Sequence, residues 1–91
     1  MRDNYYVQCW ANVMRKGEQI KTHSHGSNNH MYLSGNICVL TENTNTHYIL
    51  PYFDNRFSSK NEMGKITMFP FWLKHYTDEV STDLRITIAF D

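Results

Sequence analysis

The sequence predicts a small all-β protein, built as a sandwich or a barrel. No stretch keeps the apolar period of an amphipathic helix. Short segments rich in β-branched and aromatic residues alternate instead with turn-rich stretches, a pattern typical of strands. The chain has 91 residues and a formal net charge of zero, so we expect one small domain over residues 1–91.

The first expected strand covers residues 5–14 and has two different faces. Its even positions include the polar residues Gln8 and Asn12, and its odd positions are all apolar or aromatic: Tyr5, Val7, Cys9, Ala11 and Val13. After a turn at Gly17 we expect a polar strand over residues 19–25, which carries two histidines.

Strands and polar stretches alternate through the middle of the chain. After a loop, a strand covers residues 31–40, with a bulge or bend expected at Ser34-Gly35. A polar turn leads into the next strand, at residues 47–52. Residues 54–64 are polar and show no periodicity, so we expect a loop there.

Two short strands and one longer strand complete the chain. The first covers residues 65–69 and is stopped by Pro70, and the second covers residues 72–76. After an acidic turn, residues 84–90 form the clearest strand of all. One face of this strand is entirely apolar, with Leu84, Ile86, Ile88 and Phe90.

Composition excludes several classes of function. Zero net charge gives no electrostatic reason to bind nucleic acid or an anionic membrane. No apolar run could span a bilayer, and the polar N-terminus does not resemble a signal peptide. Cys9 and Cys38 are far apart in apolar surroundings, which favours reduced thiols and a cytoplasmic location, although one disulfide stays open. A metal or a second subunit would help so small a domain, because it buries only about 60–65% of its unfolded surface.

Three histidines form a candidate metal site. His23 and His25 are two residues apart in an expected strand, so both side chains point to one face. His75 follows the sharp bend at Pro70, which can turn its side chain inward. Neutral imidazole suits Fe, Zn, Cu and Ni. The plainer interpretation is that all three are surface histidines in a histidine-rich chain, as we expect for His30.

Arg85 and Thr87 form a candidate anion anchor. They share the polar face of the last strand. The planar guanidinium can bind a carboxylate through two hydrogen bonds, and a hydroxyl two residues further on can donate to the same group. The alternative is a half-buried strand whose polar face lies in water.

Together these segments resemble a known family. The chain contains Trp10-Ala-Asn12, His23-Ser-His25, Ser34-Gly35, Phe69-Pro-Phe-Trp-Leu-Lys-His75 and Arg85-Ile-Thr-Ile-Ala-Phe90. In this order they resemble 2-oxoglutarate/Fe(II)-dependent oxygenases of bacteria and phages that are related to prolyl hydroxylases. The spacing of glycines, Pro70 and histidines is also similar to the two cupin motifs. Both resemblances imply one fold, a double-stranded β-helix of the jelly-roll type with little or no helix.

The resemblance implies roles for particular residues. His23 and His75 would bind Fe(II), with His25 as the third ligand. Arg85, assisted by Thr87 and Asn12, would bind the cosubstrate 2-oxoglutarate. The protein would then use O2 to hydroxylate a C–H bond of a small-molecule or peptidyl substrate.

The sequence departs from this family in three places. A carboxylate usually stands where this chain has His25. Ile37 and Cys38 follow Ser34-Gly35, where an aromatic partner of the cosubstrate is usual. Relatives also carry an N-terminal helical region that covers the larger sheet, whereas this chain begins almost at the first barrel strand.

The last departure predicts an oligomer. If Arg85 and Asn12 face inward, the apolar faces of both their strands lie bare, which is rare in a soluble monomer. We therefore expect a homodimer that packs the face of Leu84, Ile86, Ile88 and Phe90. The chain could instead be a fragment of a longer protein. Two other functions stay open: a metal-binding cupin that acts on a small molecule without 2-oxoglutarate, and a non-catalytic β-sandwich binding module.

Overall fold

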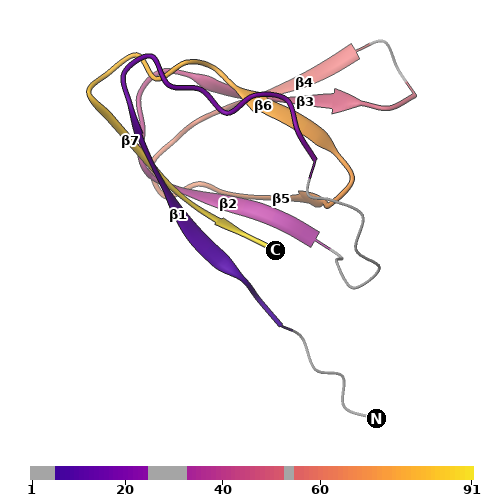
Figure 1. Ribbon diagram of the computed structural model, residues 1–91. Coiled ribbons are helices and arrows are strands. Elements are labelled where there is room, and N and C mark those ends of the chain that lie inside the picture. Colours follow the sequence, from indigo (N-terminus) through magenta and orange to yellow (C-terminus); the bar gives the residue numbers. More distant parts are fainter. Residues whose placement is uncertain (1–5, 25–32, 53–54) are drawn as a thin grey trace.

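The computed structural model describes residues 6–24, 33–52 and 55–91, and within them every regular element is a β-strand. Two antiparallel sheets face each other (Figure 1). The expected small all-β fold is therefore confirmed. The seven strands are β1 (Cys9–Arg15), β2 (Leu33–Leu40), β3 (Asn45–Leu50), β4 (Asn55–Lys60), β5 (Ile66–Pro70), β6 (Lys74–Thr77) and β7 (Leu84–Phe90). None of the described residues belongs to a helix that could cross a membrane.

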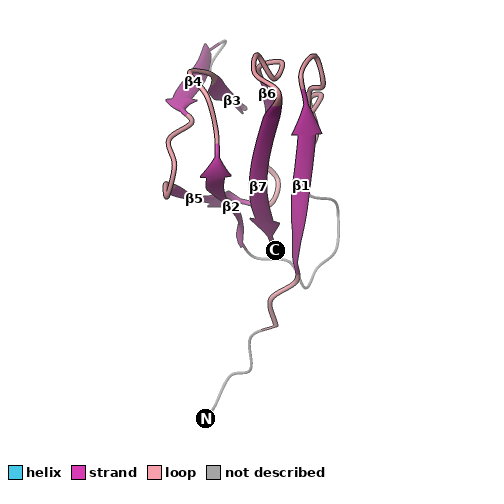
Figure 2. Ribbon diagram, turned by 90° about the vertical axis from the view of Figure 1, so that its left-hand side faces the viewer, coloured by secondary structure: helices cyan, strands magenta, loops and turns pink. Residues whose placement is uncertain are grey.

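Strands that are distant in sequence are neighbours in the sheets. The larger sheet has the order β1-β7-β2-β5, and the smaller has the order β4-β3-β6. The chain thus crosses repeatedly between the two sheets, and its last strand pairs with its first (Figure 2). The segment that follows β1 lies beside β6, where His23 and His75 form an isolated antiparallel bridge.

The larger sheet has polar side chains on its inner face. Asn12 on β1, Asn36 on β2, and Arg85 and Thr87 on β7 all line the space between the sheets. Strand side chains alternate, so the intervening apolar residues point outward. Arg85 and Thr87 therefore face the space between the sheets, as expected for an anion anchor, and not the solvent, which was the alternative that the sequence left open.

Aromatic side chains form the centre of the small apolar core. The ring of Phe69 on β5 lies 5.2 Å from the ring of Tyr48 on β3, so the contact joins the two sheets. Both residues are buried, as are Met14, Val80 and Ala89. Phe69 also lines the space that remains between the sheets.

Two of the expected element assignments are wrong. Residues 55–60, expected to be in a loop, form β4, which pairs with β3 along its whole length. Because β4 is an edge strand and mostly exposed, its sequence needs no apolar alternation. Within residues 19–24 there is no extended strand: His23 forms a single β-bridge with His75, and the Ile20 carbonyl oxygen accepts one hydrogen bond from the Thr77 amide. The rest of the expected strand, at His25, lies outside the described residues.

The glycine expected to mark a bulge has another role. Pairing is regular through Ser34 and Gly35, and the irregularity lies instead between Cys38 and Leu40. A Cβ atom on Gly35 would lie 2.4 Å from the ring of Phe90 and 2.5 Å from the carbonyl oxygen of Thr67. Glycine is therefore required for close packing between neighbouring strands, and the ring of Phe90 lies over it.

Candidate metal centre

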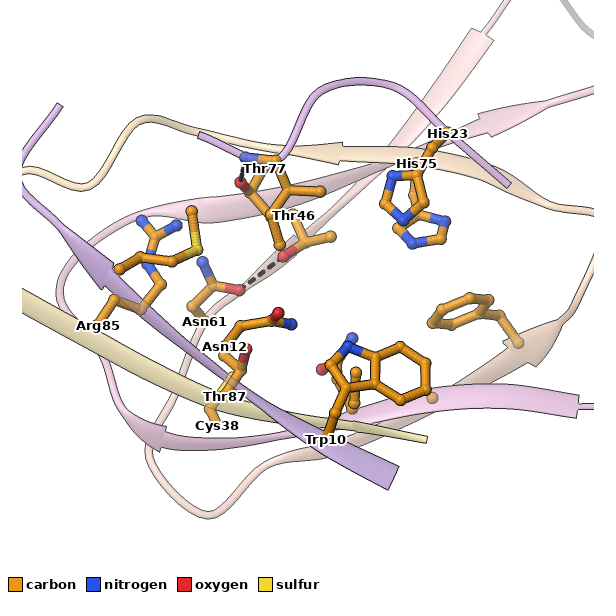
Figure 3. A pocket seen from close by; sticks show the side chains of 16 residues that line it. Trp10, Asn12, His23, Cys38, Thr46, Asn61, His75, Thr77, Arg85 and Thr87 are labelled. Carbon is orange, nitrogen blue, oxygen red and sulfur yellow. Dashed lines mark hydrogen bonds between the residues drawn. The ribbon is translucent and has the colours of Figure 1, made fainter. Parts of the chain in front are cut away.

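A cavity of about 190 Å³ lies between the two sheets. Its wall includes all five of the described candidate residues: Asn12, His23, His75, Arg85 and Thr87. Figure 3 shows the two histidines at one end of this cavity and Arg85 at the other. The fold thus brings together residues from β1, β6, β7 and the segment after β1.

The backbone places the two histidines side by side. The amide of each donates a hydrogen bond to the carbonyl oxygen of the other, and both N···O distances are 3.0 Å. This pairing puts the side chains of His23 and His75 on one face, with ring centroids 4.4 Å apart. Two imidazoles in this relation can both reach one ion.

Hydrogen bonds to the backbone orient both rings. Nδ1 of His23 lies 2.9 Å from the carbonyl oxygen of Lys21, and Nδ1 of His75 lies 2.9 Å from that of Leu73. A carbonyl oxygen only accepts, so Nδ1 must carry the proton in both rings. In the neutral ring Nε2 then carries the lone pair, as in many histidines that bind metals through Nε2.

The environments of the two histidines differ. His75 is buried, and its ring lies against Phe69 and Tyr48, with centroid distances of 4.6 and 5.7 Å. His23 is exposed at the mouth of the cavity. One imidazole thus lies in the core, and the other lies on the exposed side of the cavity.

The proposed third ligand, His25, lies outside the described residues. Within residues 6–24, 33–52 and 55–91, no group of three His, Cys, Asp or Glu side chains could hold a metal ion. The described part of the site is therefore the pair His23 and His75.

Arg85 lies at the other end of the cavity and is 2% exposed. Its guanidinium makes an ion pair with Glu42, with Nε 2.9 Å from Oε1. The guanidinium also donates to the hydroxyl of Thr44 at 2.7 Å and to the carbonyl oxygen of Asp78 at 3.1 Å. The group expected to bind a cosubstrate carboxylate thus binds a carboxylate of its own chain.

Glu42 is held in its charged form. Burial alone would raise the pKa of the Glu42 carboxyl, but hydrogen bonds from Thr44, Arg85 and Thr82, together with the charge of Arg85, lower it below its ordinary value. The thiol of Cys38, which also lines the cavity, has its pKa raised by burial. The Glu42–Arg85 pair therefore carries no net charge, and this end of the cavity is electrostatically neutral.

The rest of the cavity wall combines neutral polar side chains with one indole and with the apolar residues Met14, Ile20, Phe69 and Ala89. Asn61 accepts a hydrogen bond from Thr46 and donates one to Thr44, which links the wall to the Arg85 network. Asn12 on the edge strand β1 is paired in register with Thr87 on β7, and Trp10 also borders the cavity (Figure 3). Such a mixed lining suits a small ligand that has both polar and apolar groups.

Reasoning from sequence missed Glu42 and Thr44. Both lie at the turn between β2 and β3, more than forty residues before Arg85, where a polar residue looks like an ordinary loop residue. The only signal was that a buried arginine requires a carboxylate partner.

A second histidine network lies away from the cavity. Ser58 on β4 lies 2.7 Å from Nδ1 of His47, and Nε2 of His47 lies 2.8 Å from Oδ1 of Asp78. The three residue types are those of a Ser-His-Asp triad, but the ring nitrogens are exchanged, because in a triad Nε2 faces the serine and Nδ1 faces the carboxylate. However, none of the three residues lines the cavity. Thr46 and Tyr48 on either side of His47 are buried between the sheets, so the side chain of His47 points to the opposite face. This network is a cross-strand ladder on the outer face of the smaller sheet.

Comparison with solved structures shows what the fold is similar to. The chain matches Drosophila melanogaster CENP-C bound to CAL1 with a TM-score of 0.73 at 4% identity, over 89% of this chain and 61% of that one. It matches a cupin domain from Bordetella pertussis Tohama I with a TM-score of 0.66 at 13% identity, over 99% of this chain and 84% of that one. No protein family profile and no curated protein matches the sequence.

These likenesses establish the fold alone. The chain is a small cupin-like β-barrel made of two facing antiparallel sheets. It spans less than two thirds of the length of the CENP-C chain. The cupin-like part of the expectation is thus confirmed.

Proposed function

We propose that the protein is a metal-binding cupin-type protein that acts on a small molecule, with His23 and His75 as metal ligands and His25 as the third. One observation carries the proposal: both described histidines hold Nδ1 against a backbone carbonyl and lie side by side at a cavity. The alternative of dispersed surface histidines does not account for that pairing.

The donor set fits a divalent transition metal. Two imidazole nitrogens at about 2.1 Å from one ion lie roughly 3 Å from each other, and rings with centroids 4.4 Å apart are compatible with this separation. Imidazole ligands suit Fe(II), Zn(II), Cu(II) or Ni(II). The ion would supply Lewis-acid or redox chemistry when bound.

The remaining residues would select and orient the bound molecule. Phe69 and Tyr48 pack against His75 and limit water at its inner side. Asn12 and Thr87 present amide and hydroxyl groups to the cavity, while Trp10 offers an aromatic surface. The exposed position of His23 makes the metal end the point of entry.

The end of the cavity that contains Arg85 supports a more specific function. An Fe(II)- and 2-oxoglutarate-dependent oxygenase needs a cation across the cavity from the metal, and Arg85 lies there beside Thr87 (Figure 3). In that case the cosubstrate would replace Glu42 on the guanidinium, so its binding has to overcome an internal ion pair. The oxygenase is therefore our second candidate.

Metal titration distinguishes these functions. We expect one Fe(II), Co(II) or Zn(II) per chain by calorimetry, at least tenfold weaker binding after His75→Ala or His23→Ala, and unchanged binding after His47→Ala. Anaerobic addition of 2-oxoglutarate to the Fe(II) protein tests the second candidate through a visible charge-transfer band that Arg85→Ala abolishes. Metal binding without that band supports the first function alone. If the folded protein binds no metal, both the cupin-type and the oxygenase hypotheses are wrong, and the non-catalytic binding module remains.

A further inference from the structure

The outer face of the larger sheet is apolar across all four strands. In register, one row contains Cys9, Phe90, Gly35 and Met68, and the next contains Ala11, Ile88, Ile37 and Ile66. A third row contains Val13, Ile86 and Leu40. No charged side chain lies in these three rows, and depletion of charge is typical of the core of a protein interface.

The edge strands of this face are well exposed. Val13 is 56% exposed on β1, and Ile66 and Met68 are 61% and 57% exposed on β5. Each partner buries about 800 Å² in a standard protein interface, and the three rows form a contiguous apolar surface that runs across the full width of the sheet. Soluble monomers rarely leave so broad an apolar face exposed, so we expect a partner to cover it.

We propose that this face packs against the same face of a second copy, with the two-fold axis parallel to the strands. Such an axis places β1 of one copy over β5 of the other. The small side chains Cys9 and Ala11 then lie opposite the large Met68 and Ile66. A two-fold axis perpendicular to the strands would instead place β1 of one copy over β1 of the other. Small side chains would then face small side chains and leave gaps, which close-packed protein interiors avoid.

The central strands also suit this arrangement. Within one copy the ring of Phe90 lies over Gly35 and fills the space that a side chain at this position would occupy. Ile88 and Ile37, paired in register, form the middle of the face. Two such faces can pack in the aligned manner of a β-sandwich, about 10 Å apart.

Sedimentation velocity tests the pairing. We expect a particle of twice the 10.8 kDa chain mass at micromolar concentration, and an Ile66→Lys variant that sediments as a monomer. Phe57→Lys on β4 is the matched control, because Phe57 is also 61% exposed but lies in the other sheet, and it should remain dimeric. A wild-type monomer at every concentration, or an Ile66→Lys variant that stays dimeric, would overturn the proposal.

A cysteine variant tests the orientation. In Met68→Cys, oxidation should link the new thiol to Cys9 of the second copy, so that a covalent dimer appears on a non-reducing gel. Met63→Cys, in the turn before β5, provides a thiol at a residue of similar exposure (69%) and should remain monomeric on the gel. A Cys9–Cys9 dimer of the unmodified chain would show that the axis runs across the strands and would refute this arrangement.

Discussion

The carboxylate of Glu42 neutralises the guanidinium of Arg85 inside the barrel. The two residues are 43 positions apart, and their side chains are 6% and 2% exposed. Thr44 donates to the carboxylate of Glu42 and accepts from the guanidinium of Arg85, so one hydroxyl touches both charges. This pair fixes the turn between the sheets to the last strand and sets the charge at one end of the cavity.

Replacing Glu42 should have opposite effects on stability and on anion binding. Glu42→Gln leaves Arg85 buried without its counter-charge, and removing one partner of a buried pair costs about 3–5 kcal/mol. Urea unfolding should show that loss. At the same time, a small dicarboxylate should bind the variant more tightly than the wild type, as measured by calorimetry. Glu62→Gln, at an exposed position, should change neither quantity.

Acid should weaken the folded state. Burial would raise the pKa of Asp78, but hydrogen bonds from His47 and from the Asn45 amide lower it, and the pKa of Glu42 is lowered in a similar way. A carboxyl whose pKa is lowered on folding adds stability above its unfolded pKa of about 4, and that stability is lost as the pH falls through the folded-state pKa. We therefore expect the free energy of unfolding to drop below about pH 4. A flatter profile in Glu42→Gln would support the assignment, and an unchanged slope would contradict it.

Gly35→Ala should destabilise the larger sheet. The added methyl group would meet the carbonyl oxygen of Thr67 and the ring of Phe90 at distances that no relaxed structure tolerates. Overpacking of this kind costs about 1–3 kcal/mol. The melting temperature should fall accordingly, whereas Ser81→Ala, at an exposed loop position, should leave it unchanged.

Replacing His75 should lower the stability of the fold more than replacing His23. His75→Ala opens a space beside Phe69 and Tyr48 in the core, so we expect a loss of about 1–3 kcal/mol in the free energy of unfolding without metal. His23→Ala removes an exposed side chain and should cost less than about 0.5 kcal/mol. Equal losses in the two variants would show that His23 contributes to the core.

The strong alternation of apolar and polar residues made parts of the fold predictable. Arg85 and Thr87 alternate with four apolar residues on β7, so their shared face could be inferred, and the fold places that face inside. The β4 strand could not be inferred, because neither face of an exposed edge strand has to be apolar, and its sequence therefore shows no alternation. Glu42 could not be predicted for a related reason. Its burial depends on Arg85, a partner in a distant strand, and the residues next to Glu42 in the sequence do not indicate that contact.

The bridge between His23 and His75 consists of two backbone hydrogen bonds next to a stretch with no regular strand. The His23 amide should therefore exchange with deuterium faster than the amides of β3, because so small a pairing can break without unfolding the sheet. An ion held by both imidazoles would join the ends of a long chain segment and slow this exchange. Filling of the metal site and local opening of the barrel would then be linked events, and the exchange rate of one amide would report on both.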